Sequence, residues 1–141
     1  MKRIDRALAI LLVLGAIITV VYWCNYFSVG EVRVLPDYWY SAFENSFPAA
    51  DGWMALCMLI AGIGLWRGNR FGALFGLMAG SALIYLAAMD ITFNVQHGLY
   101  KLLGRSGPMV AETAINFTSL TLGIVTLAVS WRRSAHSDAG H

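Results

Sequence analysis

The sequence predicts an all-α integral membrane protein, a compact bundle of four transmembrane helices with both termini in the cytoplasm. Of its 141 residues, 58% are hydrophobic and 13% are charged, whereas soluble domains are about 45–50% apolar and about 25% charged. Four apolar runs are long enough to cross a bilayer, and basic residues gather on one side of them. Because four spans of about 20 residues use about 80 positions, we expect a single membrane domain over residues 1–141.

The first span is expected at about residues 7–27, after a basic N-terminal segment. A basic segment followed by an apolar run also begins a signal peptide. This run is longer than a typical signal core, however, and it ends in bulky residues at 22–27 instead of a small-residue cleavage site. We therefore expect an uncleaved transmembrane helix.

The other spans are expected at about 50–66, 71–96 and 109–131. The short link at 67–70 makes the second and third spans a helical hairpin, and Pro108 stands where a helix tolerates a residue without N–H. The segment 28–49 is an extracytoplasmic loop, in which 37–43 is expected to lie along the membrane interface. The polar cytoplasmic tail, residues 132–141, is expected to be disordered from 134 onward.

Charge gives the predicted orientation. The basic residues divide seven to three between the two sides, and the positive-inside rule places the larger group in the cytoplasm of a cell (inner) membrane. Six of the eight acidic residues then lie at or near the outer face. No basic stripe indicates a nucleic-acid partner. The larger basic group is Lys2, Arg3, Arg6, Arg67, Arg70, Arg132 and Arg133, and the outer acids are Glu31, Asp37, Glu44, Asp51, Asp90 and Glu112.

Small and polar residues share one face of the third span. A glycine stands at every fourth position from residue 72 to residue 80, a spacing that lets membrane helices approach closely. Eighteen residues make five helical turns, so Asp90 and Asn94 lie on the face of Gly72 and Gly76, and His97 joins them if the helix continues that far. The fourth span has a similar face, with an acid at its outer end: Glu112, Asn116, Ser119, Gly123, Thr126 and Ser130.

The two spans therefore present two acid–amide pairs at similar depth, and we expect a polar site open to the outer side. Ionisable residues within spans are costly and often functional, although an acid near a helix start and an amide between helices also serve structure alone. The catalytic candidates are Asp90, Glu112 and His97; the ligand-binding candidates are Asn94, Asn116, Asp51, Glu44 and Trp53. No motif indicates a cofactor, a bound metal stays open, and so does pairing of Cys24 with Cys57.

Three functions fit this pattern. The first is binding or transport of a cation, a proton or a small polar ligand at the outer face, where crowded carboxylates share a proton, in a homo-oligomer if it transports. The second is an intramembrane enzyme that uses Asp90 and Glu112 for acid–base chemistry on a lipid or isoprenoid; gathered acids would then prefer magnesium or calcium to zinc. The third is an accessory subunit of a larger membrane complex. The sequence leaves open whether the protein is an enzyme.

Overall fold

The computed structural model describes residues 3–29 and 33–138, and within them it is all-helical. Four helical stretches are long and apolar enough to cross a membrane, which confirms the predicted number of spans. Lys2 and Glu31, which entered the charge pattern, lie outside the described residues, as do residues 139–141. In chain order the elements are α1 (Arg3–Ser28), α2 (Tyr38–Glu44), α3 (Pro48–Arg67), α4 (Arg70–Gln96), the 3₁₀-helix η1 (Leu99–Leu102) and α5 (Gly107–Asp138).

The prediction of a disordered C-terminal tail is wrong for residues 134–138, because α5 continues through Asp138. This part of the tail contains no glycine or proline that would end the helix; the first glycine after the span is Gly140. Near this end of the helix Arg133 forms an ion pair with Asp5 of α1, at 2.7 Å. The predicted loop 28–49 is also partly helical, since it contains α2 and the first two residues of α3.

The predicted hairpin of the second and third spans is confirmed by the link between α3 and α4. Gly68 ends α3 in the left-handed conformation, with φ of 67°, which glycine adopts without steric cost. The Asn69 side chain caps α4 by accepting a hydrogen bond from the backbone N–H of Phe71 at 3.1 Å. A Cβ atom on Gly72 would lie 2.5 Å from the backbone nitrogen of Leu65, so glycine is needed where the two helices meet.

Glycines also bring α4 and α5 together. Gly80 faces Gly123, and a Cβ atom on Gly80 would lie 2.9 Å from backbone atoms of α5. The predicted face of α4 is confirmed up to Asn94, because its glycines are buried together with Leu83, Ala87 and Asn94. The predicted face of α5 is confirmed too: Glu112, Asn116, Thr126 and Ser130 are its buried polar residues.

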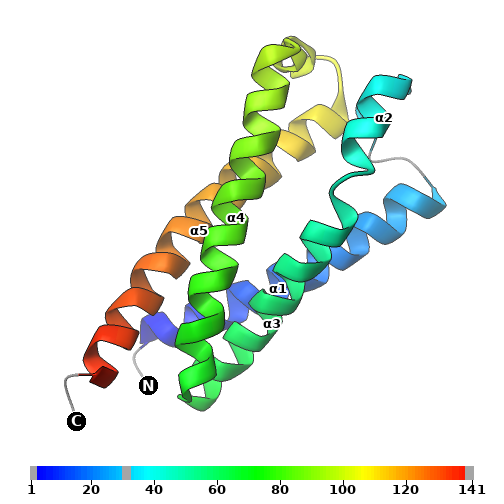
Figure 1. Ribbon diagram of the computed structural model, residues 1–141. Coiled ribbons are helices and arrows are strands. Elements are labelled where there is room, and N and C mark those ends of the chain that lie inside the picture. The colour runs from blue at the N-terminus through cyan, green and yellow to red at the C-terminus, as the bar shows by residue number, and fades with distance from the viewer. Residues whose placement is uncertain (1–2, 30–32, 139–141) are drawn as a thin grey trace.

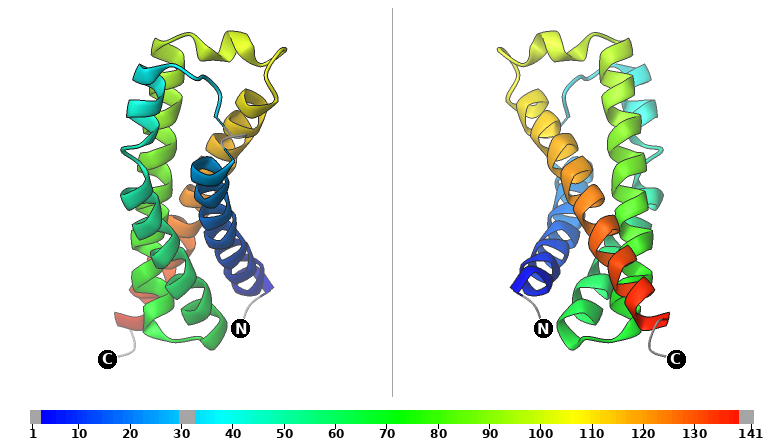
Figure 2. Two further views of the ribbon diagram at one scale, coloured as in Figure 1. Left: turned by 90° about the vertical axis from the view of Figure 1, so that its right-hand side faces the viewer. Right: turned by 90° about the vertical axis from the view of Figure 1, so that its left-hand side faces the viewer.

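The helices pack in the order α1, α3, α4, α5, and α1 makes far fewer contacts with α5 than with α3. Figure 1 shows both termini at one end of the bundle, where the Asp5–Arg133 ion pair joins α1 to α5. Figure 1 shows α1 and α5 diverging toward the opposite end, which carries α2 and η1, and in Figure 2 the two helices cross. We call the two ends the terminal end and the α2 end.

Candidate functional site

A cavity of about 90 Å³ lies at the α2 end, and we call it the acidic cavity. It has contributions from α1, α2, α3, α4 and α5, so the whole bundle forms it. Among the described residues no lysine, arginine or histidine lines it. The polar lining residues are Thr19, Tyr22, Trp23, Glu44, Asp51, Asp90, Glu112, Asn116 and Ser119, and the apolar ones are Ile18, Phe47, Met54, Leu83, Leu86, Ala87 and Ile115.

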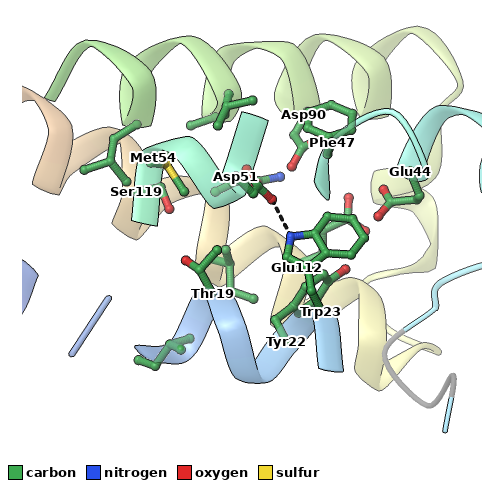
Figure 3. A pocket seen from close by; sticks show the side chains of 16 residues that line it. Thr19, Tyr22, Trp23, Glu44, Phe47, Asp51, Met54, Asp90, Glu112 and Ser119 are labelled. Carbon is green, nitrogen blue, oxygen red and sulfur yellow. Dashed lines mark hydrogen bonds between the residues drawn. The ribbon is translucent and has the colours of Figure 1, made fainter. Parts of the chain in front are cut away.

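Four carboxyl groups reach this cavity from four different helices. Figure 3 shows the side chains of Glu44 from α2, Asp51 from α3, Asp90 from α4 and Glu112 from α5 around the indole of Trp23. Ionised carboxyl groups that line one small cavity repel one another. Since no described residue of the lining carries a positive charge, the cavity is electrostatically suited to a cation.

Glu112 is held in place by two hydrogen bonds. The hydroxyl of Tyr40 donates to Oε2 at 2.9 Å, and Nδ2 of Asn94 donates to Oε1 at 2.5 Å. All three side chains are buried, and hydrogen bonds to a carboxylate are stronger than neutral ones. Burial raises the pKa of the Tyr100 hydroxyl; the side chain of Asn94 lowers it in part, and the charges of Glu112 and Asp90 raise it further.

Asp51 and Asp90 have different surroundings. The indole Nε1 of Trp23 donates to Oδ2 of Asp51 at 2.8 Å, which fixes the ring against the carboxyl group (Figure 3). Asp90 is half-buried, lines the cavity and accepts no hydrogen bond from any described residue. Both oxygens of Asp90 are therefore free to accept hydrogen bonds from a ligand.

Asn116 adds an amide to the cavity wall. Its side chain is 2% exposed, and its Nδ2 has no hydrogen-bond partner among the described residues. A buried amide without a partner costs about 1–3 kcal/mol relative to a paired one. Because Asn116 lines the cavity, a ligand oxygen or a bound water is the natural acceptor for this donor.

The structure brings most of the predicted site residues together. Glu44, Asp51, Asp90, Glu112 and Asn116 line the cavity. Asn94 lies behind this layer and reaches it through its hydrogen bond to Glu112.

His97 and Trp53 do not line the cavity, and their predicted roles stay predictions. His97 follows the end of α4, so the helical register does not extend to it; its ring is exposed and stacks on Trp39 with centroids 4.9 Å apart. Trp53 is 50% exposed on the surface of α3. It stands two residues after Asp51, about 200° around the helix at 3.6 residues per turn, and thus points away from the carboxyl groups.

Three aromatic residues of the site went unassigned in the sequence. Tyr22 and Trp23 line the cavity, and Tyr40 holds Glu112. The positions of Thr19, Tyr22 and Trp23, three and four residues apart, carry a usable signal, since this spacing puts them on one face of a helix. Tyr40 carries no such signal, because its contact with Glu112 joins residues 72 apart in the chain.

In the part of the chain that the structure describes, no three His, Cys, Asp or Glu residues are placed to hold a metal ion together. Both cysteines are free thiols. Cys24 is exposed and Cys57 is buried.

The fold and this cavity define an all-helical protein of the multi-pass membrane class, with four apolar helices and an acidic cavity at one end. Comparison of the chain with known protein families, with curated proteins and with solved structures finds no match.

Proposed function

We propose that this protein binds a small cationic group in the acidic cavity, in the service of ligand recognition or transport. The observation that carries this proposal is a cavity lined by four carboxyl groups and, among the described residues, by no basic side chain. Carboxylates crowded into a partly desolvated space repel one another, and a cation among them relieves that repulsion. The faces of Tyr22 and Trp23 add a second attraction for a cation.

The volume of the acidic cavity limits the size of the group that it can hold. A volume of about 90 Å³ corresponds to about three water molecules at about 30 Å³ each. It falls well below the roughly 300–1,000 Å³ typical of pockets that enclose drug-sized molecules. An ammonium head group or a hydrated ion fits this volume, whereas a lipid chain does not. The volume thus counts against an enzyme that would enclose a whole lipid substrate here.

The proposed roles of the two central acids differ. Asp90 accepts no hydrogen bond from the residues that the structure describes and would contact the ligand directly. Glu112 has both oxygens engaged by Tyr40 and Asn94, so it would contribute charge at a fixed position. By the positive-inside rule, we further propose that both termini are cytoplasmic and that the cavity faces outward.

Titration calorimetry with ethylammonium chloride, on protein in lipid nanodiscs, tests this function. We expect Asp90→Asn to weaken binding at least tenfold, because it removes the charge without changing the shape. Glu112→Gln should weaken it too. The control Asp37→Asn changes an exposed acid outside the cavity and should leave the affinity unchanged. Equal affinity of the Asp90→Asn variant, or equal binding of neutral ethanol, would rule out the proposed function.

A further inference from the structure

Next to the acidic cavity lies a second space, which we call the apolar groove, with a volume of about 380 Å³. Five residues of α1 and three of α3 line it, and nearly all of its surface is apolar. Thr19 and Trp23 line both spaces, so the groove and the cavity lie on either side of these two side chains. On the cavity side, Trp23 donates a hydrogen bond to Asp51.

We propose that the ligand is a cationic amphiphile, an alkylammonium whose head occupies the acidic cavity and whose chain lies in the apolar groove. The inference rests on the proposed function and adds the chemical class of the ligand. Two features support an alkyl chain in the groove. The lining of the groove is apolar, and the groove shares Thr19 and Trp23 with a cavity whose carboxyl groups attract an ammonium head. The combination matches an amphiphile in polarity, since an acidic space lies beside an apolar one.

A second observation at the head site is independent of the acids. The Asn116 side chain, 2% exposed and with its Nδ2 unpartnered among the described residues, lines the cavity. It offers N–H donors to an oxygen carried near the head, such as a hydroxyl or a water that accompanies the ammonium group. A primary ammonium itself has three N–H donors, which suit Asp90 as acceptor.

Chain length is not by itself a clean test, because a longer chain concentrates any amphiphile in the bilayer. A position-specific readout avoids this difficulty. Cys24 lines the groove and is exposed, whereas Cys57 is buried. The rate at which a membrane-permeant maleimide alkylates Cys24 therefore reports whether the groove is filled.

The experiment compares four probes on the full chain in nanodiscs: decylammonium, decanol, decyl sulfate and ethylammonium. We expect decylammonium to slow Cys24 alkylation at least tenfold at a membrane concentration at which decanol and decyl sulfate slow it less than twofold. Ethylammonium should bind by calorimetry without protecting Cys24. Asp90→Asn should remove the protection, and Asp37→Asn should keep it.

A groove variant gives the complementary test. A Cβ atom on Gly52 meets nothing within 4 Å, and Gly52 lines the groove, so Gly52→Leu adds a side chain at an open position of the groove. We expect this variant to weaken decylammonium binding at least tenfold and ethylammonium binding less than twofold. Gly104→Leu, also at an open position but outside the groove, is the matched control and should leave both affinities unchanged.

The outcomes separate the two proposals. If ethylammonium binds and depends on Asp90, but decylammonium leaves Cys24 unprotected, the amphiphile inference is overturned and the proposed function stands. Equal protection of Cys24 by all three decyl compounds also overturns it, since the groove would then select no head group. If neither ammonium compound binds, both proposals fail together.

Discussion

Tyr40 provides a direct test of how the site is organised, because one oxygen atom separates it from phenylalanine. Its side chain is 1% exposed, and its hydroxyl donates to Oε2 of Glu112 at 2.9 Å. The ring packs in a small cluster with Leu99 and Met109. Tyr40→Phe keeps that packing and removes only the hydrogen bond.

The expected cost follows from the kind of bond removed. Hydrogen bonds to charged groups contribute about 1.5–3 kcal/mol to stability, and the buried carboxylate that loses its donor has only Asn94 left. We therefore expect Tyr40→Phe to lower the free energy of unfolding by about 1.5–3 kcal/mol. Tyr38 is the control: it belongs to the same helix, is 88% exposed, and Tyr38→Phe should change stability by less than about 0.5 kcal/mol.

Equilibrium unfolding in mixed micelles, followed by tryptophan fluorescence, measures both variants. A double-mutant cycle with Glu112→Gln isolates the contact: Tyr40→Phe should cost at least about 1 kcal/mol less when residue 112 is glutamine. If Tyr40→Phe is as stable as Tyr38→Phe, the bond to Glu112 contributes nothing, and Glu112 is not held as described.

Two further predictions concern the scaffold. Gly80→Ala places a Cβ atom 2.9 Å from backbone atoms of α5 and should lower the free energy of unfolding by about 1–3 kcal/mol in the same assay. Gly52→Ala is the control: its Cβ atom meets nothing within 4 Å, so the variant should be as stable as the parent or more stable. Equal stability of the two variants would contradict close packing of α4 on α5. Arg133→Gln removes the 2.7 Å ion pair with Asp5 and should lower the free energy of unfolding by about 1.5–3 kcal/mol. Arg132→Gln changes the exposed neighbouring residue and should lower it by less than about 0.5 kcal/mol. If Arg133→Gln destabilises the protein no more than Arg132→Gln, the ion pair does not hold α1 and α5 together at the terminal end.

Helical periodicity predicted the parts of this protein that depend on local order. The faces of α4 and α5 could be read from the sequence because side chains recur every 3.6 residues, and the acids on those faces indeed line one cavity. The same rule misplaced His97, since periodicity does not show where a helix ends, and α4 ends at Gln96.

Helical periodicity does not predict contacts between residues far apart in the chain. The bonds from Tyr40 to Glu112 and from Trp23 to Asp51 join residues 72 and 28 apart in the chain. Aromatic residues near a span end are commonly interfacial, so composition alone does not identify these residues as part of a site. Tyr40 lies near a buried carboxylate because α2 packs on Phe93 of α4 through Tyr40 and Phe43.

The contrast between Glu112 and Asp90 bears on whether these acids serve structure or a ligand. A carboxylate that only fixes helix packing needs a donor on a neighbouring element, and Glu112 has two, from Tyr40 and Asn94. Asp90 lines the same cavity and accepts no hydrogen bond from the described residues. In a purely structural role, no hydrogen bond from these residues would offset the free-energy cost of burying its carboxyl group. The donor that Asp90 lacks is what a bound ammonium group supplies, which is why Asp90 and not Glu112 is the decisive position for testing ligand binding.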